Sequence, residues 1–155
     1  MPQCPDKESK IPSAVRIVIP GGNPMKKILI VDDQPEISRL LEIVLRRVDR
    51  QILQAENGRD GIDMARRNQP DLILLDIMMP GGMDGYEVAR TLKAEPATAG
   101  CPIIAMTAKV REQDRIEALE AGADEYIRKP FDVLEVKRRV EELLVQNQNK
   151  AESCM

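Results

Sequence analysis

The sequence predicts an α/β fold of the (βα)5 type, with five parallel strands in one doubly wound sheet. The first observation is size and composition, because 155 residues with 43% hydrophobic and 32% charged side chains are typical of one globular domain. The second is order: short aliphatic runs alternate five times with longer segments of helical periodicity. The third is that these runs lack regular polar alternation, which is typical of parallel strands buried on both faces. Right-handed crossovers then place helices on both sides of the sheet.

The predicted strands share aliphatic or β-branched side chains, and a helical segment follows each of them. They are residues 28–31, 51–55, 72–75, 102–106 and 126–127. We expect all five to be buried on both faces of the sheet.

The first predicted helix has the clearest pattern. Its apolar positions are Ile37, Leu40, Leu41, Val44, Leu45 and Val48. They follow the spacing i, i+3, i+4, i+7, i+8, i+11, so they form one apolar stripe on a helix. Pro35 lies where a proline of the first turn belongs.

The other four helices are predicted from caps and apolar spacing. They cover residues 58–67, 84–94, 112–121 and a last segment after Pro130. Asp84 and Asp132 are the expected N-caps of the third and last helices, and Gly122 is the expected left-handed residue that closes the fourth. The apolar stripe of the last helix is Val133, Val136, Val140, Leu143 and Leu144.

The two ends of the chain differ from the predicted domain, which covers residues 25–146. Residues 147–155 read as a polar, frayed tail. Residues 1–24 are either a disordered extension or a gene-start artefact, in which case Met25 is the true initiator.

Composition excludes several classes of function. The chain has no histidine, which excludes His-based nucleophilic triads, His-ligated zinc and a phosphohistidine carrier. A net charge of −3 without a basic stripe, and only three aromatic residues, argue against direct nucleic-acid binding.

Three cysteines, Cys4, Cys101 and Cys154, show no spacing typical of a metal site, and their number is odd. They indicate ordinary thiols in a reducing compartment, so we expect a cytoplasmic protein. The first 24 residues fit neither a signal peptide nor a membrane span.

Polar side chains follow four of the five predicted strands. Asp32 and Asp33 follow the first strand, Asp76 ends the third, Thr107 follows the fourth and Lys129 follows the fifth. Because the carboxyl ends of parallel strands meet at one edge of a sheet, we expect these groups to converge there. Three clustered carboxylates repel one another unless a cation neutralises them, and an all-oxygen site with loose geometry favours Mg²⁺.

The chemistry open to this cluster is phosphoryl transfer to a carboxylate. Asp76 is the candidate nucleophile and would form an acyl phosphate. Such transfer depends on positioning and on charge stabilisation, which Lys129 and a metal would supply, with a hydrogen bond from Thr107.

Five short motifs at the strand ends resemble the receiver family of response regulators in two-component systems. They are Val31-Asp32-Asp33, Leu74-Leu75-Asp76-Ile77-Met78-Met79-Pro80, Met83-Asp84-Gly85, Met106-Thr107-Ala108 and Lys129-Pro130-Phe131. The resemblance covers about residues 26–146 and implies a flavodoxin-like sheet with strand order 2-1-3-4-5, as in chemotaxis regulators.

The resemblance also implies a metal site. It makes Asp76 the phosphoacceptor and makes Asp33 and Asp76 direct Mg²⁺ ligands. The carbonyl of Met78 is the implied third ligand, and Asp32 acts largely through water.

The remaining implied roles concern the response to phosphorylation. Lys129 matches the phosphate-binding lysine, Thr107 the switch hydroxyl and Tyr126 the switch aromatic. One departure is that the loop after the third predicted strand is one residue longer than usual, with Gly81 and Gly82 between Pro80 and Met83.

The expected function is therefore a stand-alone signalling switch rather than an enzyme with its own substrate. A histidine kinase or phosphotransfer protein would phosphorylate Asp76, and because no output domain follows Lys150, the effect would fall on a separate protein. A phosphorylation-dependent dimer involving Arg115 and Glu135 is a further expectation.

Two other classes stay open at this point. An Asp-nucleophile phosphatase or phosphotransferase would need a second carboxylate two residues after the nucleophile, where this chain has Met78. A phosphorylation-independent scaffold would not need the complete acidic set.

Overall fold

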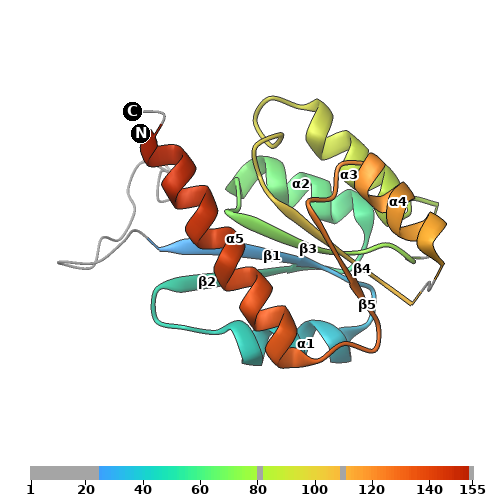
Figure 1. The fold of residues 1–155 in the computed structure, drawn as a ribbon, viewed down its shortest axis with the longest axis horizontal. Coiled ribbons are helices and arrows are strands. Elements are labelled where there is room, and N and C mark those ends of the chain that lie inside the picture. Colours follow the sequence, from blue (N-terminus) through green and yellow to red (C-terminus); the bar gives the residue numbers. More distant parts are fainter. Residues whose placement is uncertain (1–24, 80–81, 109–110, 154–155) are drawn as a thin grey trace, which may run out of the picture.

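The computed structural model describes residues 25–79, 82–108 and 111–153, with side chains described through Val145. Within these ranges strands and helices alternate five times. They are β1 (Lys26–Val31), α1 (Pro35–Leu45), β2 (Arg50–Ala55), α2 (Gly58–Asn68), β3 (Leu72–Asp76), α3 (Gly85–Ala94), β4 (Ile103–Thr107), α4 (Glu112–Glu120), β5 (Glu125–Arg128) and α5 (Val133–Ser153). All strand pairs are parallel and the sheet order is β2-β1-β3-β4-β5, which confirms the predicted fold (Figure 1).

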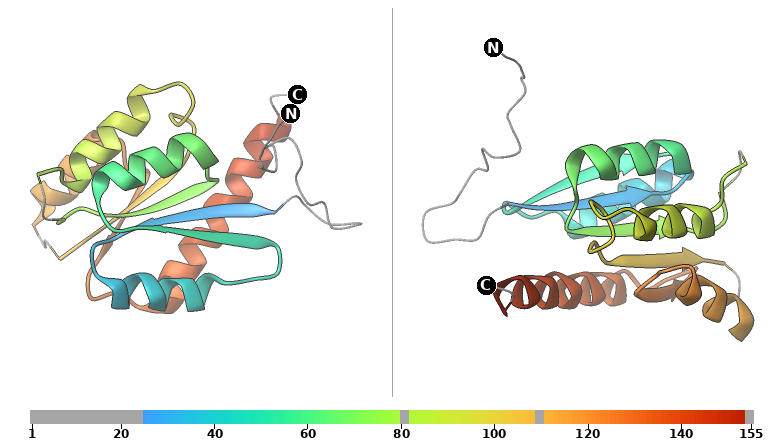
Figure 2. Two further views of the ribbon diagram at one scale, coloured as in Figure 1. Left: turned by 180° about the vertical axis from the view of Figure 1, so that it is seen from behind. Right: turned by 90° about the horizontal axis from the view of Figure 1, so that it is seen from above.

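Two helical layers enclose the sheet, one with α1 and α5 and one with α2, α3 and α4 (Figures 1 and 2). Side chains of a strand alternate between its faces, so β1 contributes to both layers. Ile28 and Ile30 pack with Leu41 of α1 and Val140 of α5. Their neighbours on the strand point to the other layer, where Val31 packs with helices α2 and α3.

Burial differs between the centre and the edges of the sheet. Every residue of β3 and β4 is buried, as predicted for central parallel strands. The expectation that all five strands are buried on both faces is wrong for β2 and β5. These are the two edge strands, so each has a neighbouring strand on one side only, and Gln51 and Gln54 of β2 are exposed.

Helix α1 is shorter than its apolar pattern predicts. It ends at Leu45, because Arg46 has an extended backbone with φ −64° and ψ 131°. Val48 therefore lies outside the helix and is 90% exposed. The buried stripe of α1 is formed by Leu41 and Leu45, whereas Leu40 is partly exposed.

The predicted caps of the other helices are confirmed. The side chain of Asp84 accepts a hydrogen bond from the N–H of Glu87, and Asp132 accepts one from the N–H of Leu134. Gly122 follows α4 with a positive φ of 119°. The backbone of α5 stays helical to Ser153 instead of fraying after residue 146. The prediction for residues 1–24 lies outside the described residues, as do Pro80 and Gly81 of the longer loop.

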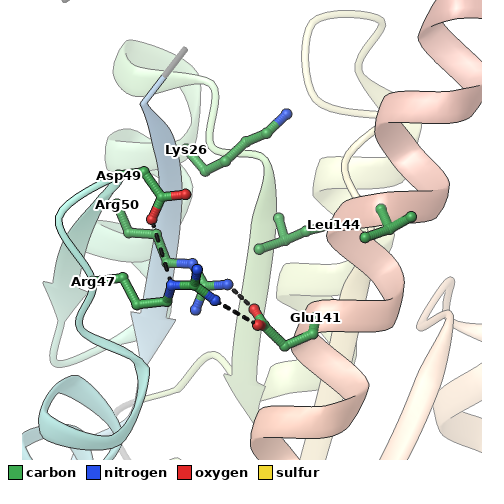
Figure 3. A pocket seen from close by; sticks show the side chains of 7 residues that line it. Lys26, Arg47, Asp49, Arg50, Glu141 and Leu144 are labelled. Carbon is green, nitrogen blue, oxygen red and sulfur yellow. Dashed lines mark hydrogen bonds and ion pairs between the residues drawn. The ribbon is translucent and has the colours of Figure 1, made fainter. Parts of the chain in front are cut away.

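A cluster of charged side chains joins the helical layer of α1 and α5 to the amino end of β2 (Figure 3). Arg50, whose side chain is 5% exposed, forms an ion pair with Glu141 of α5 and donates to the carbonyl of Leu45 at 3.2 Å. Arg47 also donates to Glu141, at 2.9 Å. This cluster lies at the end of the sheet opposite to the carboxyl ends of the strands.

Candidate functional site

Three carboxylates meet at the carboxyl ends of β1 and β3. Asp32 and Asp33 directly follow β1, and Asp76 is the last residue of β3. These strands are neighbours, and one oxygen from each carboxylate lies within 4.8 Å of the other two. Asp32 and Asp76 are almost fully buried, at 1% and 3% exposure. The predicted convergence of these three residues is confirmed.

Backbone N–H groups of the following loops hold two of these carboxylates in place. The N–H of Gln34 donates to Asp32 Oδ1 at 2.8 Å, and the N–H of Met78 donates to Asp76 Oδ1 at 3.3 Å. Both bonds span two residues, so each carboxylate is fixed by the turn that follows its own strand.

Lys129 brings a positive charge to the same place from the end of β5. Its ammonium lies 3.0 Å from Asp32 Oδ2 and 3.4 Å from Asp76 Oδ1, and its side chain is 14% exposed. The N–H of Lys129 donates to the carbonyl of Thr107 at 2.8 Å, and the peptide bond from Lys129 to Pro130 is cis.

Thr107 and Tyr126 lie on the two strands beyond Asp76. Asp76 pairs in register with Met106 of β4, so Thr107 is one residue further toward the carboxyl edge, and it is fully buried. Tyr126 pairs with Ala105 and packs, partly buried, against the helical layer of α2, α3 and α4.

The electrostatics of the site centre on Asp76. Burial, and next the negative charge of Asp32, raise the pKa of Asp76 to about 6, although Lys129 acts in the opposite direction. A raised pKa means that the ionised form is disfavoured in the folded protein. Lys129 therefore offsets only part of the cost of ionising Asp76.

These three side chains fit a small divalent cation. Among the described residues, Asp32, Asp33 and Asp76 form the one group of acidic or sulfur and nitrogen ligands compact enough to hold a metal ion. Carboxylate oxygens suit hard cations, and a cation here would offset the charge that raises the pKa of Asp76.

Gly85 lies at the site, and its presence in the Met83-Asp84-Gly85 motif did not explain its role. A Cβ atom at this position would lie 2.5 Å from the Ile77 Cα and 2.6 Å from the carbonyl oxygen of Asp76. The N–H of Gly85 also donates to the carbonyl of Ile77 at 2.9 Å. The start of α3 is therefore packed directly on the backbone of the candidate phosphoacceptor.

Gln34 is a second residue at the site, and sequence reasoning missed it. Besides its N–H bond to Asp32, its side-chain oxygen lies 3.5 Å from the ammonium of Lys129. Its position directly after the Asp-Asp pair was the only available signal.

Comparison with known proteins agrees with this geometry. Residues 28–141 match the response regulator receiver domain family. The chain is 49% identical over 118 residues to the transcriptional regulatory protein ResD of Bacillus subtilis, an alignment that covers 76% of this chain and 48% of that protein. It is 43% identical over 120 residues to RpaA of Synechocystis, a DNA-binding dual master transcriptional regulator, with 77% and 49% covered.

Solved structures show the same fold. A putative response regulator from Chloroflexus aurantiacus superposes with a TM-score of 0.72 and 33% identity, covering 78% of this chain and 98% of that one. A CheY-like receiver domain protein from Methanospirillum hungatei gives a TM-score of 0.74 at 26% identity, with 81% and 98% covered.

A doubly wound sheet with an acidic cluster and a lysine at its carboxyl edge is the architecture of a phosphorylation-controlled signalling module. The chain belongs to the response regulator receiver domain family. It spans about half the length of the curated relatives it matches. In the described part of the chain, none of the helices is long and apolar enough to span a bilayer.

Proposed function

We propose that this receiver domain accepts a phosphoryl group on Asp76 in a Mg²⁺-dependent reaction and thereby acts as a switch. The observation that carries the proposal is the cluster itself. A buried carboxylate at the end of β3 lies within 4.8 Å of two further carboxylates and 3.4 Å from a lysine ammonium.

The proposed reaction is a simple displacement at phosphorus. One carboxylate oxygen of Asp76 forms a bond to phosphorus, and the bond between phosphorus and the donor's leaving group breaks. The leaving group keeps the electron pair, and it is acetate when acetyl phosphate is the donor. Hydrolysis of the acyl phosphate by water later restores the carboxylate and releases inorganic phosphate.

Asp32, Asp33 and Asp76 would hold the magnesium ion, together with the carbonyl of Met78. The bound ion supplies positive charge that offsets the carboxylates and the phosphoryl oxygens. Lys129 supplies a second positive charge, and its ammonium already lies between Asp32 and Asp76. Its role is to pair with a phosphoryl oxygen after transfer.

Thr107 and Tyr126 are the proposed relay from the site to the surface. Thr107 follows the residue that pairs with Asp76, so its hydroxyl is the candidate donor to the phosphoryl group. Tyr126 lies on the adjacent strand, and its ring would move when Thr107 moves. The affected surface is formed by α4, β5 and α5, and it would change by a shift in population.

The proposed phosphodonor is a histidine kinase or a phosphotransfer protein, since this chain has no histidine of its own. We propose that the switched surface acts on a separate downstream protein and does not contact nucleic acid itself. A dimer that forms on phosphorylation through Arg115 and Glu135 also stays a proposal. In the unphosphorylated structure Arg115 pairs with Glu112 of its own helix, and Glu135 pairs with Arg139.

The direct test is incubation of the full chain with acetyl phosphate and Mg²⁺, followed by intact mass measurement. The proposal predicts one added phosphoryl group, which is absent in the Asp76→Asn variant and absent when a chelator removes the metal. Steady release of phosphate from unrelated phosphate esters would instead indicate a phosphatase. An unchanged mass with acetyl phosphate and with a panel of histidine kinases would contradict the proposal.

A further inference from the structure

Gln34 occupies the junction between the acidic cluster and helix α1. Its N–H donates to Asp32 Oδ1 at 2.8 Å. Its carbonyl accepts the first helical hydrogen bonds, from Ile37 at 3.1 Å and from Ser38 at 3.2 Å. The backbone of Gln34 is therefore fixed on both sides, which limits where its side chain points.

The side chain of Gln34 does not cap helix α1, although side chains at an N-cap position often do. Gln34 is the N-cap of α1, but its side chain forms no capping hydrogen bond with the helix. Short side chains such as Ser, Thr, Asp and Asn are the ones preferred for that bond. The side-chain oxygen instead lies 3.5 Å from Lys129 Nζ.

This contact adds an acceptor to the surroundings of the Lys129 ammonium. A lysine ammonium has three N–H donors and no acceptor. Among the residues that the structure describes, three oxygens lie within 3.5 Å of it: Asp32 Oδ2 at 3.0 Å, Asp76 Oδ1 at 3.4 Å and Gln34 Oε1 at 3.5 Å. The first two come from the acidic cluster and the third comes from the start of α1, so the ammonium is held from two directions.

We infer that Gln34 is a positioning residue for phosphorylation, whose amide oxygen holds the Lys129 ammonium beside Asp76. This inference rests on the proposed phosphorylation of Asp76. Without the third acceptor, the long lysine side chain has more freedom, and the ammonium turns toward Asp32, where the contact is shortest. Fewer chains then have the ammonium placed to pair with a phosphoryl oxygen at Asp76.

The test compares two substitutions of nearly equal length in the full chain. Gln34→Met keeps the length and removes the acceptor, whereas Gln34→Glu keeps an oxygen in the same place. Gln51→Met, at an exposed position of β2, is the control. The first measurement is the rate of phosphorylation by acetyl phosphate at saturating Mg²⁺, followed by intact mass. The second is the NMR signal of the Lys129 side-chain CH₂ next to the ammonium, recorded without phosphodonor.

We expect Gln34→Met to lower the maximal rate about three- to tenfold, the effect of one ordinary hydrogen bond, and to shift the Lys129 signal. The Mg²⁺ concentration at half-maximal rate should change little in Gln34→Met, because the three carboxylates remain. Gln34→Glu should keep the wild-type rate within about twofold, and Gln51→Met should match the wild type in both measurements.

An unchanged rate in Gln34→Met, or a lower rate with an unchanged Lys129 signal, would overturn the inference. Equal losses in Gln34→Met and Gln34→Glu would also overturn it, since they would indicate a structural effect at the start of α1. Failure of the wild type to become phosphorylated would instead reject the proposed function, and the Lys129 signal would still report on the contact with Gln34.

Discussion

At the scale of single residues, the folded protein disfavours the ionised form of the Asp76 carboxyl group. Burial and the charge of Asp32 raise the pKa of Asp76 from 3.8 to about 6. The folded protein therefore binds a proton at Asp76 more readily than the unfolded chain does. The stability of the metal-free protein should fall as the pH rises from about 4 to above 6, and the loss is complete once Asp76 is ionised in the folded state.

Asp76→Asn should therefore stabilise the metal-free protein above pH 6. A pKa shift of this size corresponds to at most about 3 kcal/mol at pH 7.5, and the gain should shrink to roughly 1 kcal/mol near pH 4.5. Urea unfolding in the presence of a chelator at both pH values measures it. Asp63→Asn on the exposed face of α2 is the control and should have a small effect at both pH values. A gain for Asp76→Asn that did not depend on pH would contradict this explanation.

Gly85 is under a different constraint, which is the lack of room for a side chain rather than an electrostatic effect. A side chain there would collide with the backbone of Ile77 and Asp76, and neither backbone atom is free to move away. Gly85→Ala should destabilise the protein by about 1–3 kcal/mol and slow phosphorylation by acetyl phosphate, because the end of β3 must shift. Gly100→Ala is the matched control, since a Cβ at Gly100 has nothing within 4 Å. Equal unfolding midpoints for the two variants would count against this reading.

The residue scale also shows what the sequence could predict and what it could not. Asp32, Asp33, Asp76, Thr107 and Lys129 were predicted, because each follows a recognisable strand and carries a reactive group. Gln34 was missed because its contribution is one side-chain contact with a residue 95 positions away in the chain. Spacing along the sequence carries no information about such a contact.

At the scale of elements, ion pairs between residues far apart in the sequence stabilise the packing of α5 against the sheet. Glu141 of α5 pairs with both Arg47, in the connection between α1 and β2, and Arg50, the first residue of β2 (Figure 3). Burial lowers the pKa of Arg50, which means that its charge is costly where it lies. Glu141 and the carbonyl of Leu45 offset that cost.

Glu141→Gln should destabilise the fold by about 1–3 kcal/mol, because it leaves the buried charge of Arg50 without its carboxylate. Glu142→Gln, the next residue of the same helix with an exposed side chain, should change stability by less than about 0.5 kcal/mol. Thermal or urea unfolding distinguishes the two. Similar small effects for both variants would indicate that water already compensates Arg50.

The errors of the sequence prediction also belong to the element scale. The helical spacing of apolar residues extended α1 to Val48, but the helix ends at Leu45 and Val48 is exposed. Periodicity alone does not record where a chain turns to enter the next strand. Likewise, the apolar character of β2 suggested burial on both faces, whereas β2 is an edge strand, a position that only the strand order implied by the family resemblance indicated.

At the scale of the whole molecule, the fold was predictable because the strand patterns, the helical patterns and the family motifs all indicate the same fold. Alternating apolar runs and helical segments gave the five repeats, and the family resemblance gave the order β2-β1-β3-β4-β5. This order places β1 and β3 side by side, and so it joins the Asp32–Asp33 pair to Asp76.

Metal binding at this junction should stabilise the entire domain. At a Mg²⁺ concentration tenfold above its dissociation constant, the gain in unfolding free energy is about 1.4 kcal/mol. The wild type should show this gain at constant ionic strength, and Asp33→Asn should lose most of it. Asp63→Asn, outside the site, should keep it. Equal responses of Asp33→Asn and the wild type would place the metal elsewhere.

The central claim is that Asp76 itself carries the phosphoryl group. The most direct measurement is rapid cold proteolysis of the chain after treatment with acetyl phosphate and Mg²⁺, followed by mass spectrometry of the peptides. The account predicts that the added mass lies on the peptide that contains β3, with fragment ions assigning it to Asp76. A phosphoryl group found on Thr107, or on an acidic residue outside the cluster, would contradict it.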